Sequence, residues 1–135
     1  MDIAALVTWL VTAIGGFVLL GTWFAKGGHR RGGAHESRFP APLILAHFLL
    51  AAVGLVLWIA YVASDDDGLT WPAFALVAVV ALLGFTMFFR WLPQVRQRRT
   101  TAGTAEAQLP VAVVVGHGLF AATTLVLVLL AAIDR

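Results

Sequence analysis

The chain has 135 residues, of which 61% are hydrophobic and 12% are charged, and its formal net charge is +2. A soluble domain of this length cannot bury so much apolar surface, and soluble proteins carry about 25% charged residues. A water-soluble globular enzyme is therefore excluded. The absence of cysteine excludes disulfides and iron–sulfur clusters, and the small positive charge gives no reason to expect a nucleic-acid partner.

Four apolar runs are each long enough to cross a lipid bilayer, which requires about 20 helical residues. None of them alternates as a barrel strand does, so each is predicted to be a transmembrane helix. The expected helices cover residues 3–25, 40–63, 71–92 and 109–133. The first run is longer than a signal-peptide core and lacks a basic leader, so we expect it to be retained. The sequence predicts an all-α integral membrane four-helix bundle forming a single domain over residues 1–135.

The charges between these helices predict an orientation, because cytoplasmic loops are enriched in lysine and arginine. The second connection carries three aspartates at 65–67 and no cation, whereas eight of the nine cations lie on the opposite side. These eight are Lys26, Arg30, Arg31, Arg38, Arg90, Arg96, Arg98 and Arg99. We expect a plasma membrane of bacterial type, with both termini outside and both basic loops in the cytoplasm. The basic loops either only set this topology or also hold anionic lipid heads or an acidic partner.

Aromatic residues near the helix ends are expected to lie in the interfacial belts of the bilayer. These are Trp23 and Trp91 on the cytoplasmic side, and Trp58, Tyr61 and Trp71 on the outer side. Residues 100–107, between the third and fourth helices, are predicted to form a solvated linker.

The sequence repeats itself weakly at a spacing of 70 residues. Over residues 39–60 and 109–130, eight of 22 positions are identical. Both copies contain a proline followed seven residues later by a histidine: Pro40 and His47, then Pro110 and His117. Each proline is expected in the first turn of its helix.

The first and third helices repeat through residues 5–7 and 75–77, both Ala-Leu-Val. We therefore predict two repeated helical hairpins, about residues 1–66 and 67–135. A pseudo-twofold axis along the membrane normal would relate them.

His47 and His117 are the deepest titratable residues of the predicted spans, which contain no carboxylate well inside the apolar zone. Ionisable side chains in a bilayer are rare and usually face the bundle interior. Two neutral imidazoles facing each other there can hold one iron from opposite sides, which is bis-histidine haem ligation. Because the chain has no Cys-x-x-Cys-His attachment motif, haem b is the expected cofactor.

Small residues near the histidines leave room for a flat porphyrin. They are Ala51, Gly54, Ala121 and Thr124 on the histidine helices, and Gly15, Gly16 and Gly84 on the other two. Each imidazole is expected to donate its second N–H to a carbonyl one turn back, from Leu43 or Val113. Arg38 or the other loop cations are expected to neutralise the propionates.

With these Pro-x6-His-x3-Ala segments, the chain resembles a small four-helix membrane cytochrome of the b type. The resemblance covers the second and fourth helices, with His47 and His117 as axial ligands. It implies electron transfer between a quinol pool and a redox-protein partner, as a free protein or a subunit of a larger assembly. This role is that of an electron-transfer protein rather than a stand-alone enzyme.

Other classes of function remain open at this point. The histidines could bind a different metal, or only pack and hydrogen-bond inside a structural membrane anchor. The chain could also carry haem or metal ions, with His29 and His35 of the first loop used for loading. A proton-coupled drug antiporter is the least favoured, because no membrane carboxylate is present to carry the proton.

Overall fold

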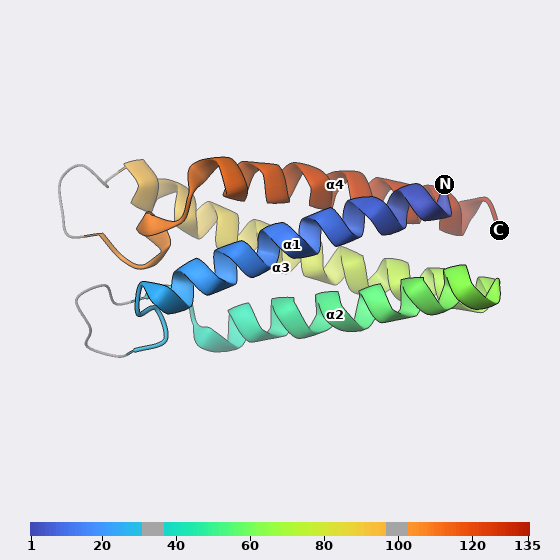
Figure 1. Ribbon diagram of the computed structural model, residues 1–135, viewed down its shortest axis with the longest axis horizontal. Coiled ribbons are helices and arrows are strands. Elements are labelled where there is room, and N and C mark those ends of the chain that lie inside the picture. The colour runs from blue at the N-terminus through green and yellow to red at the C-terminus, as the bar shows by residue number, and fades with distance from the viewer. Residues whose placement is uncertain (31–36, 97–102) are drawn as a thin grey trace.

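The computed structural model describes residues 1–30, 37–96 and 103–135, and within these ranges the fold consists of four long helices (Figure 1). The elements are α1 (Asp2–Ala25), α2 (Ala41–Ser64), a 3-10 turn η1 (Asp67–Leu69), α3 (Thr70–Arg96), a second turn η2 (Glu106–Gln108) and α4 (Val111–Ile133). All four helices are long and apolar enough to cross a membrane. The prediction of an all-α four-helix protein is confirmed, and the fold is compatible with an integral membrane protein.

The helix boundaries agree with the predicted ones to within two residues, except at the end of α3. That helix continues through Pro93 to Arg96, because a proline in the last turn removes only one backbone hydrogen bond. Pro40 and Pro110 are the caps that precede α2 and α4, rather than residues of the first turn.

The helices run along the long axis of the molecule, and the connections divide between its two ends (Figure 1). Both termini and the short connection between α2 and α3 lie at one end, which we call the terminus end. The other two connections lie at the opposite end, the loop end. Helix α1 packs mainly on α4, and α2 packs mainly on α3, so α2 and α4 occupy opposite corners of the bundle.

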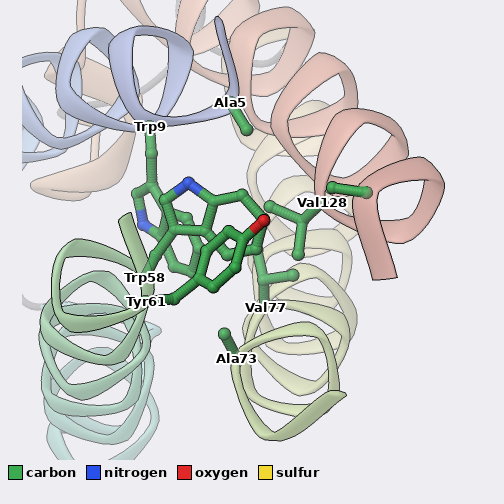
Figure 2. Packing of buried hydrophobic residues seen from close by; sticks show 8 residues of the cluster. Ala5, Trp9, Trp58, Tyr61, Ala73, Val77 and Val128 are labelled. Atoms are coloured by element: carbon green, nitrogen blue, oxygen red, sulfur yellow. The ribbon is translucent and has the colours of Figure 1, made fainter. Parts of the chain in front are cut away.

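Two clusters of buried apolar side chains fill the ends of the bundle. The terminus-end cluster consists of Ala5, Trp9, Trp58, Tyr61, Ala73, Val77, Val128 and Ala131 (Figure 2). The loop-end cluster consists of Trp23, Phe39, Trp91, Ala105 and Leu109. On the outside, large apolar side chains such as Ile14, Leu82 and Leu119 are 64–67% exposed. An apolar exterior of this kind suits a lipid environment and not water.

Four of the five aromatic residues expected in the interfacial belts lie inside the bundle instead. Trp23, Trp91, Trp58 and Tyr61 are at most 5% exposed, and only Trp71 faces outward. The prediction for those four is wrong because they fill the space between helices. The indole N–H of Trp58, for example, donates to the Asp2 carbonyl at 3.2 Å.

Buried positions of α1 recur on α3 after 68 residues, and not after the predicted 70. Ala5 and Ala73 are both buried, whereas Ala75 is exposed. On α2 and α4, by contrast, buried residues of one helix correspond to buried residues of the other at a spacing of 70, as Trp58 and Val128 do.

Candidate cofactor site

His47 on α2 and His117 on α4 lie across the bundle from each other, between the two apolar clusters. Their ring centroids are 6.3 Å apart and their planes are inclined by 58°. Both residues are partly buried. The two imidazoles predicted to lie at equal depth are therefore brought together by opposite corners of the bundle.

The remaining two helices supply a fixed acceptor for each imidazole. Nδ1 of His47 lies 3.0 Å from the Val80 carbonyl of α3, and Nδ1 of His117 lies 2.9 Å from the Thr12 carbonyl of α1. A carbonyl can only accept, so Nδ1 carries the proton in both rings. In a neutral ring this leaves the lone pair on Nε2. No hydrogen bond to either Nε2 occurs among the described residues.

The predicted acceptors were wrong. Leu43 and Val113 lie one turn back on the histidines' own helices, where their carbonyls belong to the helical ladder. The carbonyls that the imidazoles reach belong to adjacent helices, so each hydrogen bond joins two helices of the bundle.

Glycines lie directly against the imidazole rings. A Cβ atom added at Gly84 would lie 3.3 Å from Cε1 of His47, and one added at Gly16 would lie 3.3 Å from Cε1 of His117. A Cβ atom at Gly15 would lie 3.4 Å from Cβ of His117. These glycines make room for the histidine rings, and their expected position at the edges of a porphyrin stays a prediction.

The small residues of the histidine helices have different surroundings. Gly54 faces the Trp9 ring, because an added Cβ atom would lie 3.0 Å from that indole. The Thr124 hydroxyl lies 3.0 Å from the Thr8 hydroxyl and donates to the Phe120 carbonyl at 2.8 Å. Both positions are buried within protein contacts on the terminus-end side of the histidines. Ala51 and Ala121, one turn from the histidines, are partly buried.

A buried carboxylate at the loop end is a feature that sequence reasoning missed. Glu106 lies in η2, is 0% exposed and accepts a hydrogen bond from the Ser37 hydroxyl. It also accepts from the indole N–H of Trp23 at 3.3 Å and from the backbone N–H groups of Phe39 and Arg38 at 3.2 and 3.3 Å. Residues 105–107 are therefore buried, which corrects the prediction of a solvated linker over the part of it that the structure describes.

These donors keep the Glu106 carboxyl ionised. Burial raises the pKa of this carboxyl, whereas the hydrogen bonds from Ser37 and from backbone N–H groups lower it. The hydrogen bonds together outweigh burial, so the pKa lies below the usual value of 4.5. The carboxylate thereby ties the connection before α4 to the connection before α2. The side chain of Arg38, which was expected to neutralise a propionate, is exposed at this junction.

A second indole, that of Trp91, lies in the loop-end cluster. Trp91 is 3% exposed, and its Nε1 has no hydrogen-bond partner in the described part of the chain. Nearby, the buried Gln94 side chain donates to the Arg90 carbonyl at 2.8 Å and accepts from the Thr104 hydroxyl.

An open apolar groove of about 300 Å³ lies between α1 and α4 next to His117. Its lining consists of Val11, Ile14, Gly15, Val18, Val113, Gly116, His117 and Phe120. Through this groove, His117 is accessible from the outside of the bundle.

Some predicted residues play no part in this site. His29 is exposed and lies against the ring of Phe24, with centroids 5.3 Å apart. His35, Arg31, Arg98 and Arg99 lie outside the described residues. Within the described ranges, no group of three or more His, Cys, Asp or Glu side chains could hold a metal ion. Comparisons with protein-family models, curated proteins and solved structures find no match for this chain.

Proposed function

We propose that the protein is a membrane-bound b-type cytochrome that holds one haem b between α2 and α4 and transfers electrons. His47 and His117 would be the axial ligands. The observation that supports this most strongly is the matched pair of imidazoles, each with Nδ1–H directed to the carbonyl of a neighbouring helix. Histidines that bind metals typically donate their other N–H in this way, which fixes the ring orientation and leaves Nε2 for the metal.

The distance between the rings agrees with two ligands on one metal ion. Imidazole nitrogens bind metals at about 2.0–2.1 Å, and each ring centroid lies about 1.1 Å behind its nitrogen. The ring centroids of His47 and His117 are 6.3 Å apart, a separation that would allow both imidazoles to hold one metal ion. Two side chains do not make a tetrahedral zinc site, which needs more protein ligands. They do suit a haem iron, whose other four ligands come from the porphyrin.

The surrounding residues indicate where a porphyrin would extend. Trp9 fills the space beside Gly54, so the terminus-end side of the histidines is closed by protein. A porphyrin would instead extend toward the apolar groove between α1 and α4 beside His117, which is open to the outside of the bundle. Bound haem iron would supply one-electron redox chemistry. The chain's own contribution is to orient the two imidazoles and to exclude water with the apolar clusters on either side.

We further propose that the chain consists of two related hairpins inserted with both termini outside. The paired positions of His47 and His117, each bonded across to α3 or α1, support this relation. At the loop end lie Lys26, Arg30, Arg38, Arg90 and Arg96, which supports a cytoplasmic location for that end. Three aspartates at 65–67 lie at the terminus end. The electron-transfer partner would be a quinol or a redox protein at a bacterial-type plasma membrane.

A structural role for the histidines is the second candidate, and the same hydrogen bonds favour it. They join α2 to α3 and α4 to α1, and such bonds contribute about 0.6–1.7 kcal/mol each in membrane proteins. A structural anchor would be colourless and would tolerate loss of His47. A haem or metal-ion carrier would instead bind its ligand weakly and depend on the exposed His29.

The proposal is tested by visible spectra of the detergent-purified chain expressed with haem supply. We expect a sharp reduced-minus-oxidised b-type spectrum that is lost in His47→Gly and His117→Gly and retained in the matched loop variant His29→Ala. Added free imidazole should restore six-coordinate spectra to the two glycine variants, which separates ligand loss from misfolding. A colourless wild type that also fails to take up added haemin would refute the proposal.

A further inference from the structure

Trp91 presents a buried hydrogen-bond donor for which the described residues supply no acceptor. Its side chain is 3% exposed within the loop-end cluster, and its indole N–H has no acceptor among the described residues. Most buried polar groups in proteins are paired, because an unpaired one gives up its hydrogen bonds to water without replacement. An unpaired indole N–H inside a bundle therefore points to an acceptor that binds there.

The counterpart of Trp91 indicates the chemistry of that acceptor. Trp23 lies 68 residues earlier, at the spacing that relates the buried positions of α1 and α3, and it belongs to the same cluster. Its indole N–H donates to the Glu106 carboxylate at 3.3 Å and to the Ser37 hydroxyl at 3.1 Å. The tryptophan of α1 thus has a carboxylate partner, whereas the equivalent tryptophan of α3 has none in the part of the chain that the structure describes.

The position of Trp91 connects it with the histidine layer. It follows Gly84 by seven residues, which is two helical turns and about 10 Å along the axis on the same face. Gly84 lies against the ring of His47. Trp91 therefore faces the bundle interior on the loop-end side of the imidazoles, within the loop-end cluster.

We propose that the indole N–H of Trp91 donates a hydrogen bond to an ionised carboxylate carried by the bound ligand, namely one propionate of the haem. This inference rests on the proposed function and names the residue that anchors the cofactor's acidic edge. It replaces the expectation that Arg38 performs this task from an exposed position. A neutral donor in an apolar cluster holds a carboxylate without burying a second charge, and a bond to an ionised acceptor is stronger than one between neutral groups.

The test compares haemin with its dimethyl ester, in which both propionates are blocked, by absorbance titration of the full-length chain in detergent. Trp91→Phe should weaken binding of free-acid haemin about 10- to 100-fold, the range of a hydrogen bond to a charged group. The affinity for the dimethyl ester should stay unchanged. Trp58→Phe is the matched control, because Trp58 is also fully buried but its N–H donates to Asp2 at the terminus end. It should affect the two porphyrins equally.

Several results would overturn the inference. Equal weakening of both porphyrins by Trp91→Phe would mean that the ring only packs, or that its acceptor is an anionic lipid or a group of the chain. Glu36 lies outside the described residues, but in the sequence it precedes Pro40 as Glu106 precedes Pro110, so its variant is the test for an acceptor within the chain. If our inference is right, Glu36→Gln keeps the difference in affinity between free-acid haemin and the dimethyl ester. Loss of that difference in Glu36→Gln would contradict the inference. A wild type that binds neither porphyrin would refute the proposed function itself, which is a distinguishable outcome.

Discussion

Replacing Glu106 by alanine tests whether the buried carboxylate holds the two connections at the loop end together. Four donors meet this carboxylate, and a hydrogen bond to a charged group contributes about 1.5–3 kcal/mol. Two of the donors, the N–H groups of Trp23 and Phe39, also lie 3.1 Å from the Ser37 hydroxyl and keep that acceptor. Only the Arg38 N–H loses its sole acceptor among the described residues, and the Ser37 hydroxyl retains the Phe39 carbonyl at 3.2 Å.

The net loss for Glu106→Ala is therefore that of one or two charge-assisted bonds, about 2–4 kcal/mol in the free energy of unfolding. Glu106→Gln keeps the volume and one acceptor oxygen, so about 1–2 kcal/mol is expected. The assay is unfolding by increasing fractions of dodecyl sulfate in mixed micelles, followed by tryptophan fluorescence. Asp66→Asn is the control, because Asp66 is exposed and its carboxylate accepts from the Gly68 N–H at 3.0 Å, a bond that an asparagine side chain can keep. It should change stability by less than about 0.5 kcal/mol.

The pH dependence gives an independent check with a definite sign. The folded-state pKa of Glu106 is depressed below its usual value of 4.5. Its contribution to stability is therefore fully present above that value and is lost as pH falls through the lowered folded-state pKa. The stability difference between wild type and Glu106→Gln should narrow only in that acidic range. A Glu106→Ala variant as stable as wild type at pH 7 would refute the reasoning.

Two further predictions concern the middle of the bundle. Gly84→Leu should displace the ring of His47, because even a Cβ atom at Gly84 would lie 3.3 Å from Cε1 of that ring. We expect overpacking to destabilise the protein by about 1–3 kcal/mol, measured by unfolding. We also expect haem uptake to be lost, measured by absorbance. Gly118→Leu, with nothing within 4 Å of its Cβ position, is the control, and equal effects of the two would contradict the assigned contact. Thr124→Val should cost about 0.6–1.7 kcal/mol by removing the hydroxyl that meets Thr8. A double-mutant cycle with Thr8→Val measures that bond, and strict additivity of the two losses would count against it.

The helices and the depth of the histidines could be predicted because they depend on local sequence. Hydrophobic length defines a span, and the distance from Pro40 to His47, or from Pro110 to His117, determines how far along the helix each imidazole lies. The acceptors could not be predicted in the same way. Which carbonyl meets an imidazole depends on which helices are neighbours and on how they slide past each other. The carbonyls of Val80 and Thr12 are indistinguishable in sequence from those around them.

Residues whose role depends on distant partners were assigned incorrectly for the same reason. Glu106 lies among small polar residues, a composition typical of a solvated linker, and only the approach of Ser37 and Trp23 makes its burial favourable. Tryptophan near the end of a span usually indicates an interfacial position. Trp23 and Trp91 point inward because the ends of this bundle have space that large rings fill. The signal that could have located Glu106 is its match with Glu36 before each helix-capping proline.

The direction of the two imidazole hydrogen bonds has a consequence for how the protein assembles. His47 belongs to the first half of the chain and bonds to α3 of the second half, while His117 belongs to the second half and bonds to α1 of the first. Each half thus holds one histidine and the hydrogen-bond acceptor for the other half's histidine. In two-stage folding of membrane proteins, helices insert first and associate afterwards. On such a pathway the two helical pairs would insert separately, and both imidazoles would become oriented only when the two halves associate.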